Sequence, residues 1–326
     1  MKYRFRLLSL AALLCAVVGV GTLKARAAAK RVPPDHQELT IRSAGIDRHC
    51  LVHLPPASDG AASLPLVIVL HGWGGTGANA VRETGWSAKA DVETFIVAYP
   101  EASRPHPLQP PHFARNPQAW YDGSGRFHSA ARAIDDVAFV GALLDRLAAD
   151  YRIDRRRIFV TGFSNGASMA FRVGAELADR VAAVAPVAGA CWLESPQPTR
   201  GISLCAITGT ADTLNPLQGG FPKMAFGGGN QGGRPKPAVH ATIATWSNAL
   251  GCPDAPAHDE TQNGVRTLRY GPGRDGADVV CITIEGLGHV WPGGVNPLPE
   301  WVVGKPTDKL RATDVIWEFF RAHPAP

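Results

Sequence analysis

The chain has 326 residues, of which 33 are basic, 28 are acidic and 45% are hydrophobic. The first 27 residues contain five basic residues and no acidic one, so the remaining 299 residues carry 28 charges of each sign. This balance leaves no basic stripe of the kind that binds nucleic acid. The length is sufficient for one large α/β domain with a sizeable core, which we expect over residues 28–326.

Residues 1–27 are typical of a signal peptide. A basic start, MKYRFR, precedes the apolar run Leu7–Leu23, and Ala25-Arg26-Ala27 is a small-residue cleavage site. An uncleaved membrane anchor is the alternative, but serine and glycine interrupt the apolar run. We therefore expect a secreted or periplasmic protein with no membrane attachment once the signal is removed.

Strands and helices alternate along the rest of the chain. Apolar and β-branched runs predict strands at 37–42, 49–55, 64–72, 94–100, 157–162, 181–189, 202–212 and 278–286. Apolar residues at helical spacing predict helices at 78–93, 133–151, 166–181 and 312–323, and a proline-rich excursion fills 101–125. The alternation predicts an α/β fold with a mainly parallel central sheet and helices on both faces.

The stretch Gly162-Phe163-Ser164-Asn165-Gly166 joins a predicted strand to a predicted helix. A G-x-S-x-G sequence is a weak signal alone, because glycine and serine are common in turns. Between a strand and a helix, however, it is the context of a nucleophile elbow, which holds a serine hydroxyl at the top of a sheet. Ser164 is therefore the candidate nucleophile, and an ordinary turn serine is the alternative.

A serine hydroxyl needs a base to take its proton, and the base needs an orienting acid. In the α/β-hydrolase chain order the acid follows the serine and a histidine follows the acid. Asp212 and His289 each follow a predicted strand, in that order. A turn aspartate and a surface histidine are the separate alternatives, but both positions together favour an acid and a base.

The stretch His71–Gly75, HGWGG, follows another predicted strand. A turn of this kind can present a backbone N–H to a developing oxyanion. We assign one donor to the amide of Trp73 and the second to the amide of Asn165, the residue after the candidate nucleophile. A flexible glycine loop is the alternative for HGWGG.

Five cysteines follow the leader: Cys50, Cys191, Cys205, Cys252 and Cys281. An exported protein meets an oxidising compartment, so pairing is expected with one cysteine left over. Cys252 ends a predicted helix and Cys281 lies in a predicted strand, and this pair is our best prediction for a disulfide. No C-x-x-C spacing points to a zinc site.

Six motifs in order resemble one family: VLHGWGG, AWYDG, DDVAFVGALLD, RIFVTGFSNGASMA, GTADTLNPLQGG and GLGHVWPGG. Together they are similar to exported α/β-hydrolase esterases related to polyhydroxybutyrate depolymerases and feruloyl esterases. The resemblance implies the α/β-hydrolase fold and the roles already assigned: Ser164 nucleophile, Asp212 acid and His289 base, with oxyanion amides at Trp73 and Asn165. It also suggests that Trp120, Tyr121 and Trp291 flank the substrate cleft, although packing of Trp291 under its loop is an equal alternative.

The resemblance implies hydrolysis of a carboxylic ester through an acyl-enzyme, with no metal or organic cofactor. Poly(3-hydroxybutyrate) or its oligomers are the expected substrates, and a feruloyl or acetyl-xylan ester is the alternative. Unlike many such depolymerases, the chain is expected to have no linker and no polymer-adsorbing domain, and its glycine-rich segment 221–237 is expected to be a loop or a lid. A catalytically inactive binding protein on the same scaffold is a further alternative, which the three filled positions oppose.

Overall fold

The computed structural model describes residues 33, 35–58, 62–132, 134–222 and 234–326. The predicted signal peptide at 1–27 and most of the glycine-rich segment 221–237 lie outside these residues. In the described ranges no helix is both long and apolar enough to cross a membrane.

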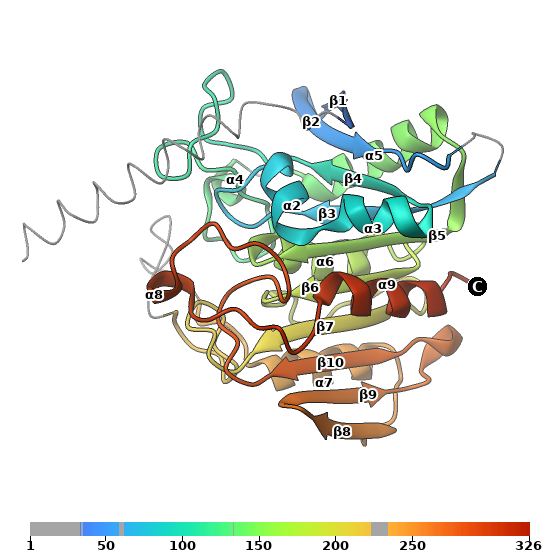
Figure 1. The fold of residues 1–326 in the computed structure, drawn as a ribbon, viewed down its shortest axis with the longest axis vertical. Coiled ribbons are helices and arrows are strands. Elements are labelled where there is room, and N and C mark those ends of the chain that lie inside the picture. Colours follow the sequence, from blue (N-terminus) through green and yellow to red (C-terminus); the bar gives the residue numbers. More distant parts are fainter. Residues whose placement is uncertain (1–32, 34, 59–61, 133, 223–233) are drawn as a thin grey trace, which may run out of the picture.

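One ten-stranded sheet runs through the molecule in the order β1-β2-β4-β3-β5-β6-β7-β10-β9-β8 (Figure 1). Its six central strands, β4 to β10 in this order, are parallel, and the two strands at each edge are antiparallel. The strands are β1 (His36–Ser43), β2 (Ile46–His53), β3 (Leu64–Leu70), β4 (Ile96–Pro100), β5 (Ile153–Phe163), β6 (Ala183–Val187), β7 (Ser203–Gly209), β8 (His258–Gln262), β9 (Val265–Tyr270) and β10 (Val279–Ile284). The prediction of a mainly parallel central sheet is confirmed.

Helices cover both faces of the sheet and divide the core into two layers (Figure 1). One layer is filled from α5 (Asp136–Asp150), α6 (Asn165–Glu176) and α7 (Val239–Ala249). The other is filled from α2 (Gly77–Thr84), α3 (Trp86–Glu93) and α9 (Ala312–Ala322). Three shorter helices, α4 (His128–Ala131), η1 (Arg274–Gly276) and α8 (Glu300–Val303), lie in the connections.

The continuous apolar runs of the sequence became strands because both faces of the sheet are covered. In β3, six of the seven residues are buried, and all seven residues of β7 are buried. Alternate side chains of such a strand enter opposite layers of the core, so both faces must be apolar. HGWGG follows β3 and Asp212 lies just after β7. Burial of these two strands in the core therefore sets the positions at which the two loops begin.

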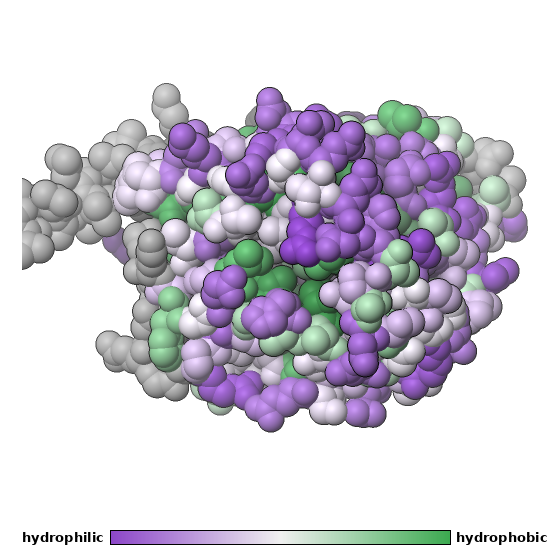
Figure 2. Space-filling model, turned by 90° about the horizontal axis from the view of Figure 1, so that it is seen from below, coloured by the Kyte–Doolittle hydropathy of each residue, from purple (hydrophilic) through white to green (hydrophobic). Residues whose placement is uncertain are grey.

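The hairpin of β8 and β9 was not predicted from the sequence. All five residues of β8 are exposed, and they are charged or polar: His, Asp, Glu, Thr and Gln. Figure 2, which views the molecule from the side of β8, shows hydrophilic residues over much of this face and a hydrophobic patch near its centre. Charged side chains on an edge strand discourage pairing with another chain. A strand with no buried face carries no alternating apolar pattern, which is why it was missed.

The predicted disulfide between Cys252 and Cys281 is wrong. All five cysteines in the described part of the chain are free and buried. Cys252 and Cys281 belong to the same hydrophobic layer, but Cys281 is held within β10 between β7 and β9, and the sulfur of Cys252 packs against Gly273. A disulfide needs a specific arrangement of both Cβ atoms, which a shared layer does not supply.

We expect Cys252 and Cys281 to be alkylated as free thiols when the protein is unfolded without reductant. Burial raises the pKa of the Cys281 thiol to about 11, so in the folded protein it stays protonated and slow to react. Peptide mapping after iodoacetamide treatment, with and without denaturant, tests this. A Cys252–Cys281 cross-linked peptide, or a melting temperature that falls on addition of reductant, would contradict the structure.

Candidate active site

Ser164 lies at the turn between β5 and α6, in a backbone conformation that is rare for a residue with a side chain (φ 56°, ψ −115°). Its amide donates to the carbonyl of Val187 on β6, at 3.0 Å. A Cβ on Gly166 would lie 2.2 Å from the carbonyl oxygen of Leu70, so only glycine lets the turn pass this close to β3. The strand-to-helix geometry predicted for a nucleophile elbow is therefore present.

Ser164, His289 and Asp212 form one hydrogen-bonded line, as their order in the sequence led us to expect. Nε2 of His289 is 2.9 Å from the hydroxyl oxygen of Ser164, and Nδ1 is 2.7 Å from Oδ2 of Asp212. Asp212 follows β7 and His289 follows β10, so two neighbouring parallel strands deliver them to the same edge of the sheet. This is the edge at which open α/β sheets place their ligands.

The hydrogen bonds of Asp212 define the proton positions on His289. Burial opposes ionisation of the Asp212 carboxyl, but His289 and the amide of Asn215 outweigh it and lower the pKa below its usual value. Oδ1 also accepts the amides of Leu214 and Asn215, at 2.9 and 2.7 Å. An ionised carboxylate only accepts, so Nδ1 of His289 carries the proton and Nε2 is left to accept from Ser164.

Backbone hydrogen bonds hold the loop of His289 in place. The amide of His289 donates to Val303 at 2.5 Å, and the amide of Gly288 donates to Lys305 at 2.9 Å. The imidazole lies beside the ring of Phe163, with the two ring centres 4.9 Å apart. The imidazole of His289 therefore has little freedom to turn away from Ser164.

The HGWGG turn is shaped by a neutral buried histidine. Burial lowers the pKa of His71 to about 4, its Nδ1 donates to the carbonyl of Gly72, and its Nε2 accepts the amide of Ala102. The amides of Gly74 and Gly75 donate to Gln118 and Gly72. Gly72 passes close to the serine turn, since a Cβ there would lie 3.4 Å from that of Ser164. Trp73, the predicted oxyanion donor, is therefore the residue after Gly72, which packs against the serine turn.

Asn165 is the first residue of α6, where backbone N–H groups have no acceptor within the helix. Its buried side chain accepts the amide of Trp120 at 2.8 Å and donates to the carbonyl of Trp120 and to Asp122. The sequence interpretation gave Asn165 a backbone role alone. Its side-chain amide also joins the AWYDG segment to the elbow, and the only signal for this in the sequence was an asparagine directly after the candidate nucleophile.

Asn165→Ala is expected to destabilise the fold and loosen the elbow. The change leaves the Trp120 amide and the Asp122 carboxylate without their buried partner, at about 1–3 kcal/mol per group. Urea unfolding of this variant, compared with Asn248→Ala at an exposed position of α7, measures the effect. Equal free energies of unfolding for the two variants would show that the hydrogen bonds of the Asn165 side chain do not stabilise the elbow.

The three aromatic residues predicted to flank a substrate cleft lie in different surroundings. Trp120 is fully buried and donates from its indole to the carbonyl of His71. Trp291 is 5% exposed and donates to the hydroxyl of Thr313 on α9. Both placements favour packing over contact with a ligand. Tyr121 is half-buried, with the guanidinium of Arg172 over its ring at 4.8 Å.

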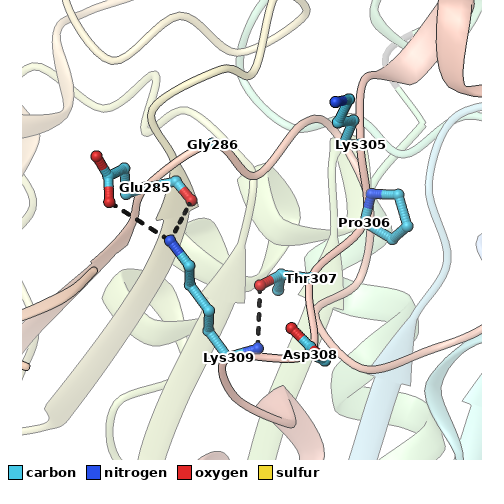
Figure 3. Close-up of a pocket in the computed structure, with 7 residues that line it drawn as sticks. All are labelled: Glu285, Gly286, Lys305, Pro306, Thr307, Asp308 and Lys309. Atoms are coloured by element: carbon cyan, nitrogen blue, oxygen red, sulfur yellow. Dashed lines mark hydrogen bonds and ion pairs between the residues drawn. The ribbon is translucent and has the colours of Figure 1, made fainter. Parts of the chain in front are cut away.

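A shallow hollow lies beside the His289 loop and is lined by Glu285, Gly286, Lys305, Pro306, Thr307, Asp308 and Lys309 (Figure 3). Lys309 reaches across it to the carbonyl and carboxylate of Glu285. None of Ser164, Asp212 and His289 lines this hollow. In the part of the chain that the structure describes, no group of three or more His, Cys, Asp and Glu residues could hold a metal ion.

A family profile described as Phospholipase/Carboxylesterase matches residues 57–221. The match covers half of the chain and includes HGWGG, the elbow and Asp212. The chain belongs to this family. It is an esterase of the α/β-hydrolase type.

Two relatives of this esterase show how far the likeness extends. A candidate esterase of Nocardia uniformis subsp. tsuyamanensis, NocK, is 33% identical over an alignment of 288 residues, which covers 81% of this chain and 77% of that protein. Poly(3-hydroxyalkanoate) depolymerase C of Paucimonas lemoignei is 26% identical over 256 residues. That alignment covers 74% of this chain and 58% of the depolymerase.

Among solved structures, the esterase resembles the acetyl xylan esterase from Aspergillus awamori with a TM-score of 0.58. The superposition covers 87% of this chain and 99% of that enzyme, at 17% sequence identity. At this identity the likeness shows the shared α/β-hydrolase fold.

Proposed function

We propose that the protein is an exported serine esterase that cleaves carboxylic esters through an acyl-enzyme. The observation that supports this most directly is the line from Ser164 through His289 to Asp212, with bonds of 2.9 and 2.7 Å. Ser164 attacks the ester carbonyl while Nε2 of His289 takes its proton. Asp212 holds the imidazole in the required tautomer and stabilises the imidazolium.

The developing oxyanion would accept hydrogen bonds from the amides of Trp73 and Asn165. One donor then comes from the turn after β3 and the other from the N-terminus of α6, where the helix dipole also favours negative charge. The alcohol leaves with the proton from His289. Water then attacks the acyl-enzyme by the same steps and releases the acid.

We propose poly(3-hydroxybutyrate)-type esters, in particular short oligomers, as the substrates. The support is the relative named as a poly(3-hydroxyalkanoate) depolymerase. A feruloyl or acetylated plant polysaccharide ester is the second candidate, supported by the relative named feruloyl esterase B of Piromyces equi and by the name of the acetyl xylan esterase.

A substrate panel separates these two candidates. The purified protein is assayed against p-nitrophenyl acetate, 3-hydroxybutyrate oligomers, poly(3-hydroxybutyrate), methyl ferulate and acetylated xylan. We expect hydrolysis of the small ester and the highest kcat/KM on the oligomers. A higher kcat/KM on methyl ferulate or acetylated xylan would select the second candidate. No hydrolysis of any ester by the folded protein would overturn the proposed function.

A further inference from the structure

Three donor side chains, two of them buried and one mostly buried, lie beside the proposed triad, on loops at the carboxyl edge of the sheet. Arg126 precedes α4, Trp192 follows β6, and Lys236 precedes α7. The guanidinium of Arg126 lies 4.6 Å from the centre of the Trp192 ring. Burial first, and the positive charge of Arg126 second, lower the pKa of Lys236. No step of the proposed mechanism uses any of the three.

These side chains offer more hydrogen-bond donors than the described residues accept. Nε of Arg126 and Nε1 of Trp192 are buried, and neither has a partner among the residues that the structure describes. Over the same residues the ammonium of Lys236, which has three donors, makes a single side-chain hydrogen bond, to Oδ1 of Asn215 at 3.1 Å. Buried donors without acceptors are costly, so these donors suit an acceptor beyond the described residues, such as a bound ligand.

The two buried carboxylates nearby are already committed. Asp122 accepts the amide of Ser124 and the side chain of Asn165, and it forms an ion pair with Nη2 of Arg126 at 3.6 Å that leaves Nε of Arg126 unpaired. Asp212 accepts His289 and two backbone amides. Neither supplies the missing acceptors of the donor cluster.

Both cations are attached to residues that contact the serine turn. Arg126 faces Asp122, which bonds to Asn165, the neighbour of Ser164. On the other side, Lys236 bonds to Asn215, whose amide donates to the carbonyl of Gly189 at 3.2 Å. Gly189 packs on the serine turn, since a Cβ there would lie 2.9 Å from the carbonyl oxygen of Ser164. A short series of hydrogen bonds and contacts therefore connects each of the two cations to the backbone around Ser164.

We propose that Arg126, Trp192 and Lys236 form an anion subsite that binds the carboxylate of an ester substrate at Ser164. The inference rests on the proposed esterase function and narrows its substrate class to monoanionic esters, in which a free carboxylate lies a few atoms from the scissile carbonyl. A short hydroxy-acid oligomer with a free acid end is such an ester, and so is a monoester of a dicarboxylic acid. A carboxylate supplies several acceptor sites and suits a guanidinium and an ammonium together.

The test compares esters that differ only in this charge. On the alcohol side the pair is 3-acetoxybutyrate and 3-acetoxybutanamide, and on the acyl side it is monomethyl succinate and methyl succinamate. The readout is the ratio of kcat/KM for the carboxylate to kcat/KM for the carboxamide. We expect a ratio of about 10 or more in at least one pair, because hydrogen bonds to a charged group carry this much free energy. The pair with the larger ratio identifies the side that the subsite serves.

Lys236→Met and Arg126→Gln are each expected to lower that ratio by about 10-fold or more, mainly through KM of the carboxylate ester. Lys305→Met, at an exposed lysine on the rim of the hollow near His289, is the matched control and is expected to keep the ratio of the unchanged protein. Lys236→Arg, which keeps the positive charge, should restore part of the preference. Equal losses on both members of a pair would mean that the cations serve the fold alone and would overturn the subsite.

The pH dependence gives a second readout. The pKa of Lys236 is lowered to about 8, by burial first and by Arg126 second. Lysine is cationic below its pKa, so the preference for the carboxylate should be full at pH 6.5 and fall as the pH rises through about 8. The carboxamide reaction of the same protein is the reference. A preference that does not change between pH 6.5 and 9.5 would contradict a role for the Lys236 charge.

If the variants do not fold, inhibition of the unchanged protein decides the question. Succinate and 3-hydroxybutyrate should inhibit p-nitrophenyl acetate hydrolysis competitively, and their amides should inhibit at least 10-fold more weakly. Hydrolysis of p-nitrophenyl acetate without any preference for carboxylates would overturn the subsite and leave the proposed function standing. A folded protein that hydrolyses no ester would overturn the proposed function first.

Discussion

Ser164→Ala is expected to lower kcat for p-nitrophenyl acetate by a factor on the order of a million, the loss measured when the nucleophile of another serine hydrolase was removed. The change removes the oxygen that lies 2.9 Å from Nε2 of His289 and leaves the backbone amide of Ser164 bonded to Val187. Alanine tolerates the φ of 56° about as well as serine does, so the fold should persist.

Two measurements check this result: steady-state hydrolysis and thermal unfolding followed by circular dichroism. Ser195→Ala, at an exposed position away from the line of the triad, is the control and should retain full activity. The assignment of Ser164 as the nucleophile would be wrong if a folded and uncontaminated Ser164→Ala preparation kept a kcat within 100-fold of the unchanged protein.

Asp212→Asn is expected to lower kcat by about 10,000-fold, the loss seen when the orienting aspartate of a serine protease was replaced in this way. The carboxylate of Asp212 only accepts, and so it keeps the proton of His289 on Nδ1. An asparagine amide can donate to Nδ1 instead, which would move the proton to Nε2 and prevent it from accepting the Ser164 proton.

The pH dependence of stability provides a further measurement on the same variant. Since folding lowers the pKa of Asp212, this group stabilises the fold above its unfolded pKa, and the contribution is lost as the pH falls. Denaturant unfolding at pH 7 and at pH 3 should therefore show a smaller acid loss for Asp212→Asn than for the unchanged protein. Asp254→Asn, at an exposed position in the loop before β8, is the control for both activity and stability. An Asp212→Asn variant with kcat within tenfold of the unchanged protein would contradict the assigned orientation of His289.

The order of Ser164, Asp212 and His289 in the chain, each next to a strand, was enough to predict that they lie close together. Asp212 and His289 are 77 residues apart, yet each follows a strand that ends at the same edge of the parallel sheet. Right-handed crossovers place all the carboxyl ends of such strands on one side, so a residue directly after a strand has a predictable position. The glycines of the serine turn were equally informative, because a Cβ at Gly166 would collide with β3.

Side-chain direction could not be read from the order of residues. Trp291 stands two positions after His289, but its indole turns inward to Thr313 on α9, a helix that sequence alone does not place under this loop. Trp120 likewise faces the core, because Asn165 and His71 bond to it from two other segments. A neighbour in sequence of the proposed base is thus not necessarily a neighbour of the substrate.

The hairpin of β8 and β9 had a local signal that the interpretation passed over. Asn263 and Gly264 lie between the two strands, and both have positive φ, at 51° and 73°. Asn-Gly is the preferred pair for a tight hairpin turn of this kind. The apolar pattern was absent because β8 has no buried face, so turn chemistry alone carried the information.

The sequence by itself determined the α/β fold, the strand-to-helix serine turn and the order of the candidate nucleophile, acid and base. Each of these depends on local patterns: apolar periodicity, glycine at a close approach, and polar residues directly after strands. Only the tertiary structure decided that Cys252 and Cys281 stay unpaired, that Trp120 and Trp291 pack inward, and that the guanidinium of Arg126 lies over the ring of Trp192. These outcomes depend on Cβ directions and on contacts between distant loops, which spacing along the chain does not fix.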